Sequence, residues 1–324
     1  MARLPIGVIG VGALGRHHAR HLARAGDAAL VGVHDIDAAR GAEVAESCGV
    51  PFFADLDGLL AAARAVTVAV PTASHVEVGV RALERGRAVL MEKPLAATLP
   101  EADTLVRAAE RRGVPLQVGH VERFNRAVRA ARPYLGEPRY IESDRLAPFQ
   151  PRGTDVAVVL DLMIHDLDLI LHLTGGAEAT DVRASGVAVL SPHLDMANAR
   201  VEFGSGAVAN VTASRLARER VRRLRIFQQD GYLSLDLGAG VGEFMRLREG
   251  WRQSGAARLD ELVDRVELLV PDEDALRLEL ESFVRSVQGG TETVVTAAEG
   301  RAALALALRV TEAVHRAPAA FHAF

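Results

Sequence analysis

The sequence predicts an α/β fold: an N-terminal doubly wound parallel sheet, followed by an α+β domain built on a large, mostly antiparallel sheet. Up to about residue 120, short apolar runs alternate with helix-compatible segments, which is typical of parallel strands buried on both faces. Beyond residue 179, alternating apolar and polar residues are joined by glycine turns, as in antiparallel hairpins. The 324 residues suffice for two cores. We place the domains at 1–121 and 122–324.

Apolar runs and helix-compatible segments define the elements of the first domain. Strands are expected at 6–9, 29–33, 65–70, 88–91 and 115–118. Helices are expected at 16–25, 38–48, 76–85 and 99–112, the last closed by Gly113.

The second domain is expected to open with helical and strand segments in turn. Residues 121–134 look helical, 139–145 form a strand, and 157–173 form one long helix ending at Gly175. Hairpin turns at 204–206 and 230–231 mark the β-rich stretch from 179 to 247. Two helices follow, at 273–287 and about 297–315, and a capping box from Thr296 to Glu299 opens the second one.

Composition excludes several classes of protein. The net charge of −4 gives no electrostatic reason to bind nucleic acid or a membrane surface. No apolar run approaches the roughly 18 residues of a membrane span, and the N-terminus has no signal-peptide anatomy, so we expect a cytoplasmic protein. The single cysteine, Cys48, excludes an internal disulfide and a cysteine-based zinc site.

The chain holds one lysine, Lys93, among 38 basic residues. A guanidinium keeps its proton near neutral pH, whereas a desolvated ammonium can lose it, so this lysine stands where an arginine would fail. Lys93 directly follows the fourth predicted strand, and ligands of open α/β sheets bind beyond the carboxyl ends of the strands. The alternative is codon bias with one surviving lysine.

A glycine-rich turn points to a dinucleotide. Gly10, Gly12 and Gly15 form a G-x-G-x-x-G pattern between the first strand and the first helix, with Ala13 and Leu14 in the same turn. The glycines allow a tight turn, close approach of the backbone to a pyrophosphate, and close packing of helix on strand. The helix N-terminus then faces the phosphates. The alternative is a fold that binds another nucleotide, such as S-adenosylmethionine.

An acid at the end of the second strand favours NAD. Asp35 lies 20 residues beyond Gly15, where a carboxylate binds the adenosine ribose hydroxyls. It would repel a 2′-phosphate, and no basic residue follows it directly, so we expect NAD rather than NADP. The alternative is a solvated turn residue.

A carboxylate and an imidazole form a second constellation. Asp161 and His165 are four residues apart and share a helix face, with leucine and isoleucine around them. A paired aspartate fixes and polarises an imidazole, as a general acid or base requires. A core ion pair or a helix cap would explain the same spacing. A metal site with Asp168 is a weaker alternative, and we expect no metal.

These motifs together resemble the Gfo/Idh/MocA oxidoreductases. The glycine turn, the Glu92-Lys93-Pro94 segment, and Asp161 with His165 stand in the family's order over nearly the whole chain. The resemblance implies that Lys93 and His165 flank the reacting hydroxyl beside the nicotinamide, and that Asp161 orients the substrate. It further implies cofactor contacts from Pro71, Thr72, His75 and Glu92. His75 could instead be a polar residue in the first turn of the next helix.

The resemblance also implies partners. Segments 119–125, 145–149 and 152–166 look like a branch of the family that oxidises the 3-hydroxyl of UDP-N-acetylglucosamine, giving a ketone for an aminotransferase in lipid A synthesis. A UDP-sugar needs cations for its diphosphate, and the candidates are Arg123, Arg145 and Arg152. Asn125 would bind sugar hydroxyls or cap a helix. The family's sheet commonly forms a subunit interface, which implies a homodimer or homotetramer.

The expected reaction transfers a hydride to NAD and a proton to a base. His165 suits the base because an unperturbed imidazole has a pKa of about 6.5, and Lys93 would stabilise the developing oxyanion. The roles could be exchanged if burial lowers the pKa of Lys93. The alternatives are another sugar or polyol dehydrogenase of the family, such as an inositol-type enzyme, and a non-catalytic NAD-binding regulator.

Overall fold

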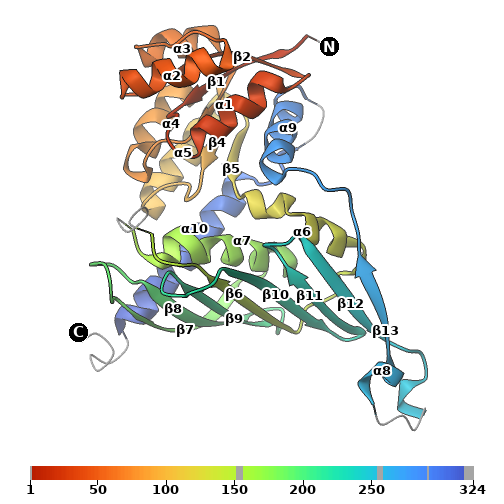
Figure 1. Ribbon diagram of the computed structural model, residues 1–324. Coiled ribbons are helices and arrows are strands. Elements are labelled where there is room, and N and C mark those ends of the chain that lie inside the picture. Colours follow the sequence, from red (N-terminus) through yellow and green to blue (C-terminus); the bar gives the residue numbers. More distant parts are fainter. Residues whose placement is uncertain (1, 151–155, 254–257, 290–291, 317–324) are drawn as a thin grey trace. The chain divides into compact units, whose positions relative to one another are not determined.

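The computed structural model describes residues 2–150, 156–253, 258–289 and 292–316. The chain divides into two compact units, which are described one at a time below (Figure 1). The first consists of Met1–Val121 and Glu273–Leu304, and the second of Glu122–Asp272 and Ala305–Phe324. Arg152, a predicted substrate residue, lies outside the described residues.

The first unit contains a five-stranded sheet in the order β2-β1-β3-β4-β5, with every pairing parallel. Its strands are β1 (Leu4–Ile9), β2 (Ala28–His34), β3 (Ala65–Val68), β4 (Ala88–Glu92) and β5 (Leu116–Gly119). This confirms the predicted doubly wound sheet. The strand order changes direction between β1 and β3, and in such sheets the ligand binds at this point, beyond the carboxyl ends of the strands.

Helices connect these strands, and several begin and end at residues with clear capping chemistry. They are α1 (Gly15–Arg24), α2 (Ala38–Cys48), α3 (Leu56–Ala62), α4 (His75–Glu84) and α5 (Leu99–Arg112). Thr98 and Glu101 form a capping box at the start of α5, and Gly113, with φ of 61°, ends it in the left-handed conformation. The Asp37 side chain caps α2 by accepting the N–H of Arg40.

A late segment of the chain completes the first core. Helix α9 (Ala275–Val287) packs against α1, and its Leu280, Phe283 and Val284 are buried with Leu4 and Ile6 of the first strand. No local pattern in the sequence signals this return, because the apolar face of a helix does not reveal which core will bury it.

The second unit contains an eight-stranded sheet in the order β13-β12-β11-β10-β6-β9-β8-β7. All its pairings are antiparallel except β6 with β9, so the predicted mostly antiparallel sheet is confirmed. The strands are β6 (Tyr140–Leu146), β7 (Ala179–Val187), β8 (Met196–Phe203), β9 (Val208–Ser214), β10 (Val221–Gln228), β11 (Gly231–Asp236), β12 (Val241–Leu247) and β13 (Val263–Leu268). The predicted hairpin turns join β8 to β9 and β10 to β11.

Two predicted helices are interrupted. The segment expected to be helical over 121–134 consists of a 3-10 turn (Val121–Phe124), α6 (Arg126–Ala131) and a second 3-10 turn (Arg132–Tyr134). Asn125 causes the first break, because its ψ of 135° is not helical and its side chain caps α6. The single long helix expected over 157–173 is instead a π-helical turn, Val159–Met163, followed by α7 (Ile164–Leu173).

The last helix, α10 (Ala297–Arg316), begins as predicted. Thr296 accepts the backbone N–H of Glu299 through its hydroxyl, and the Glu299 carboxylate accepts the N–H of Thr296. Of the helices in the described residues, none has the length and apolar character needed to span a bilayer.

Candidate active site

The turn between β1 and α1 is shaped for a pyrophosphate. Gly10 has φ of 79°, which favours glycine, and a Cβ at Gly15 would overlap the carbonyl oxygen of Gly10. A Cβ at Gly12 would meet nothing within 4 Å, so the backbone there is open to a ligand. The three glycines thus serve the three purposes that a dinucleotide turn requires, and the residues present fit the cofactor.

The N-terminus of α1 is suited to an anion. Among the described residues no side chain caps this helix, whose N-cap is Leu14, and its first turn contains no acidic residue. The positive end of the helix dipole therefore faces the glycine turn with no carboxylate in the first turn of the helix, although the N–H groups of Arg16 and His17 already donate to the carbonyls of Gly12 and Leu14.

Asp35 follows β2 beside this turn and is held as a carboxylate. Burial alone would raise its pKa, but donors from Arg40, Asp37 and Val11 outweigh burial and lower the pKa below its ordinary value of 3.8. Arg40 forms two of these hydrogen bonds, at 2.6 and 3.1 Å. The sequence reading missed Arg40 because it lies five residues beyond Asp35. The first turn of α2 brings it back over the carboxylate.

The segment containing Lys93 is fixed by the residue before it. The buried Glu92 lies at the end of β4, where one carboxylate oxygen accepts the Lys93 N–H at 3.2 Å. The other oxygen lies 3.2 Å from Nε2 of His18, a fully buried residue of α1. Glu92 therefore links α1, the helix that follows the glycine turn, to the lysine, whose own side chain is partly exposed.

His75 is buried and connects two loops at the carboxyl ends of the strands. Its Nδ1 lies 2.9 Å from the carbonyl of Pro94, and its Nε2 lies 3.0 Å from that of Val70. Burial lowers its pKa, and the two carbonyls offset this only in part. The ring joins the loop after β3 to the loop after β4. Of the residues expected on the nicotinamide side, Pro71 is exposed and Thr72 is partly exposed, whereas His75 is buried between them and the Lys93 segment.

A cavity of about 160 Å³ in the second unit brings Asp161 and His165 together. Both side chains are partly exposed, so this part of the helix is less buried than its leucine-rich sequence indicated. Asp161 lies in the π-helical turn and His165 in the first turn of α7. π-turns are rare and occur often at functional sites. The cavity is lined by Arg145, Leu146, Ala147, Pro148, Gln150, Asp161, Leu162, His165, Arg215, Arg220 and Arg222.

Four of the lining residues are arginines, and they differ in how far they are neutralised. Arg145 binds Asp166 through two hydrogen bonds and Glu122 through a third. Burial alone would lower the pKa of Arg145, but these carboxylates raise it. Burial and the charge of Arg145 lower the pKa of Arg222. Arg222 also lies 3.8 Å from Glu122, a carboxylate that already accepts a hydrogen bond from Arg145, and Arg220 is exposed. Both guanidiniums remain protonated, so they are the cations of this lining that can turn to an anion.

Arg215 approaches the same cavity from the end of β9. Its guanidinium donates to the carbonyl of Val156 at 2.7 Å and lies 3.8 Å from the carboxylate of Asp195. Asp195 is fully buried and accepts three backbone N–H groups, which lower its pKa although burial alone would raise it. Sequence reasoning missed Arg215, Arg220 and Arg222, because arginine is the ordinary basic residue of this chain and nothing local sets these three apart.

The other predicted substrate residues lie in different surroundings. Arg123 is buried and pairs with both carboxylate oxygens of Asp168 at 2.7 Å, and its Nη1 lies 2.8 Å from Nδ1 of His172. Asn125 caps α6 by accepting the Ala127 N–H. The described residues contain no cluster of three potential metal ligands.

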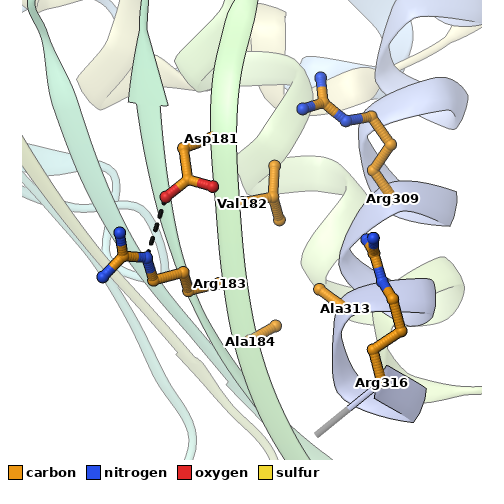
Figure 2. A pocket seen from close by; sticks show the side chains of 7 residues that line it. All are labelled: Asp181, Val182, Arg183, Ala184, Arg309, Ala313 and Arg316. Atoms are coloured by element: carbon orange, nitrogen blue, oxygen red, sulfur yellow. Dashed lines mark hydrogen bonds and ion pairs between the residues drawn. The ribbon is translucent and has the colours of Figure 1, made fainter.

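A larger cavity, of about 490 Å³, lies elsewhere in the second unit between β7 and α10 (Figure 2). Asp181 and Arg183 project from β7 and pair with each other, while Arg309 and Arg316 project from α10. None of the residues singled out in the sequence lines this cavity. Asp161 and His165 line the smaller cavity instead.

Comparison with known proteins identifies the family. Residues 4–120 match the family model described as "Oxidoreductase family, NAD-binding Rossmann fold", and residues 127–234 match the GFO/IDH/MocA C-terminal domain. The chain is 42% identical over 315 residues to the UDP-N-acetylglucosamine 3-dehydrogenase of Acidithiobacillus ferrooxidans, covering 97% of this chain and 98% of that protein. The chain belongs to the Gfo/Idh/MocA oxidoreductase family. It is therefore an oxidoreductase whose first unit binds NAD.

Other comparisons agree with this membership. The solved structure of UDP-N-acetylglucosamine 3-dehydrogenase GnnA from A. ferrooxidans superposes with a TM-score of 0.89 and 41% identity, covering 97% of this chain and 98% of that one. The myo-inositol 2-dehydrogenase of Thermotoga maritima is 27% identical over 320 residues, covering 93% of each chain. Of these two relatives, the inositol enzyme is more distant from this oxidoreductase than the nucleotide-sugar enzyme is.

Proposed function

We propose that this oxidoreductase oxidises the 3-hydroxyl of UDP-N-acetylglucosamine to a ketone with NAD. The observation that carries the proposal is the presence of Arg220 and Arg222 in the lining of the cavity that holds Asp161 and His165. A nucleotide sugar brings a diphosphate that needs cations, whereas inositol is neutral. Arg220 is exposed at this cavity, and Arg222 has only a 3.8 Å contact with Glu122, so both can turn to a diphosphate. The relative with 42% identity, which acts on this nucleotide sugar, supports the same choice.

In the proposed reaction, His165 removes the hydroxyl proton and Asp161 orients the imidazole and the sugar. Lys93 donates a hydrogen bond to the same oxygen and stabilises the charge that develops on it. Bound NAD supplies the hydride acceptor.

Glu92 positions the backbone of Lys93 for this role. A flexible lysine has high conformational entropy, and the hydrogen bond from its backbone N–H to Glu92 fixes the point from which the side chain starts. Arginine at position 93 would be longer and planar and would always be charged, so it could neither occupy the same point nor exchange a proton.

The first experiment is a panel of substrates with NAD, followed by NADH absorbance. UDP-N-acetylglucosamine should be turned over, and free N-acetylglucosamine and inositol should be turned over far more slowly. Turnover of inositol but not of the nucleotide sugar would favour the inositol-type alternative. Tight NAD binding with no turnover of any sugar would favour a non-catalytic regulator.

Lys93→Arg tests the chemistry separately from substrate identity. Turnover should fall by roughly 10²–10⁴-fold, the usual range for losing a proton-transfer or oxyanion group, while the Kd for NAD stays near that of the wild type. Arg81→Gln, a change in a surface ion pair with Asp57, is the control. Wild-type turnover in the Lys93→Arg variant would contradict the role of the lysine.

We also propose a homodimer or homotetramer formed through the face of the eight-stranded sheet that carries Tyr140, Phe227 and Tyr232. Tyr140, Phe227 and Tyr232 form a row of rings on this face, with centroids 5.9 and 5.2 Å apart, and all three are partly exposed. Aromatic residues are enriched in the cores of interfaces. Light scattering on the purified protein gives the mass, and a monomer would contradict this part of the proposal. We propose, in addition, that the protein acts in the cytoplasm.

A further inference from the structure

The carboxylate of Asp35 already has as many donors as it can accept. One oxygen accepts the Val11 N–H at 2.8 Å and Nε of Arg40 at 3.1 Å. The other accepts the Asp37 N–H at 2.8 Å and Nη2 of Arg40 at 2.6 Å. A carboxylate offers about four lone-pair sites. All four of them are therefore in use.

An adenosine ribose needs some of these sites, and only one donor residue can give them up. The N–H groups of Val11 and Asp37 are fixed by the glycine turn and by the start of α2. Arg40 holds its two sites by a side chain that is 36% exposed, whereas the Asp35 side chain is 3% exposed. Binding of the ribose hydroxyls to Asp35 must therefore move the guanidinium of Arg40 away from the carboxylate.

We propose that Arg40 decides between NAD and NADP, and that it allows this site to accept NADP(H) as a second cofactor. The backbone N–H of Arg40 is held by the Asp37 cap, so a displaced guanidinium stays within one side-chain length of Asp35 and would reach a phosphate on the 2′-oxygen. A guanidinium binds a phosphate through paired hydrogen bonds. In the free protein, Arg40 offsets the charge of Asp35, which would otherwise repel a 2′-phosphate.

One neighbouring acid works against this effect. The Asp37 carboxylate lies 3.4 Å from Nη1 of Arg40 and is half exposed, so it competes for the same guanidinium through a longer contact. The site should therefore prefer NAD and bind NADP more weakly, and both affinities should be measurable. An electrostatic contact with a 2′-phosphate is screened by salt, so added salt should weaken NADP binding more than NAD binding.

The test measures the Kd of NAD and NADP by calorimetry without any sugar, so the result does not depend on the proposed substrate. In Arg40→Gln, the Kd for NADP should rise at least about tenfold, the equivalent of 1.4 kcal/mol, while that for NAD is unchanged or lower. Arg81→Gln is the control, because Arg81 also pairs with an aspartate and its side chain is 39% exposed.

A second pair of variants completes the cycle. Asp35→Asn presents amide hydrogens to Arg40 and releases it, so the Kd for NADP should fall by roughly tenfold. Asp35→Asn combined with Arg40→Gln should lose this gain. Thermal melting shows that each variant is folded. Equal changes for NAD and NADP in Arg40→Gln, or an NADP affinity in the double variant as high as in Asp35→Asn, would overturn the proposal.

Discussion

Replacing Arg123 by methionine should unfold the second unit at a lower temperature and should not primarily affect substrate binding. The side chains of Arg123 and Asp168 are each 1% exposed and are joined by two hydrogen bonds of 2.7 Å. Methionine fills much of the same volume but leaves Asp168 as a buried charge without its guanidinium. Breaking a buried ion pair from one side typically costs about 3–5 kcal/mol.

This cost converts to a measurable shift in the melting temperature. For a unit of this size, each kcal/mol lowers Tm by roughly 2–4 °C, so Arg123→Met should lower it by roughly 6–20 °C. Arg258→Met is the matched control. Arg258 pairs with Asp260, their side chains are 73% and 68% exposed, and such pairs contribute about 0–1 kcal/mol.

Calorimetry of the wild type and both variants gives the answer. Changing Asp168 to leucine in the Arg123→Met background should recover much of the loss, because it removes the buried charge. An Arg123→Met variant that melts like Arg258→Met, but needs far more nucleotide sugar for half-maximal rate, would refute this reasoning. Arg123 would then be a substrate residue, as the sequence first indicated.

Three further predictions concern the two sites. The Gly12→Ala variant should melt within about 1 °C of the wild type and should bind NAD more weakly. The Gly15→Ala variant should melt at a lower temperature, because the added methyl group has no room. Equal melting temperatures for the two variants would contradict the account of the turn. Arg222→Gln should raise the KM for the nucleotide sugar by about tenfold, the equivalent of about 1.4 kcal/mol, with little change in the Kd for NAD; an unchanged KM would exclude Arg222 from the diphosphate site. The pKa of Asp35 in the folded protein lies below its ordinary value of 3.8, so ionised Asp35 contributes its full stabilisation of the fold above pH 3.8. This contribution is lost as the pH falls through the folded-state pKa. Melting temperatures measured across acid pH should show the loss in the wild type and not in Asp35→Asn.

Local patterns in the sequence were sufficient to predict the parallel sheet and its cofactor turn. The period of the apolar residues defined the strands. Gly10 marked a backbone conformation that few other residues allow, and Gly15 marked a position with no room for a Cβ. The same kind of signal predicted the capping box at Thr296. These features depend on residues close together in the chain, which is why they can be read without a structure.

Features that depend on distant residues could not be predicted in this way. The π-turn at 159–163 has an apolar sequence that fits an α-helix equally well. Arg123 and Arg222 look alike in the sequence, yet one is buried against Asp168 and the other lines the cavity. The partner of an arginine is set by the packing of whole elements, and 37 arginines in one chain make their individual roles indistinguishable by type.

The central claim is that a hydride leaves carbon 3 of a nucleotide sugar for NAD while Lys93 and His165 hold the oxygen on that carbon. The most direct measurement uses UDP-N-acetylglucosamine with deuterium at carbon 3 and follows the label by mass spectrometry. The account predicts that the deuterium appears in the NADH formed and that hydride transfer slows in a single turnover. Unlabelled NADH from this substrate, or no NADH at all, would contradict it.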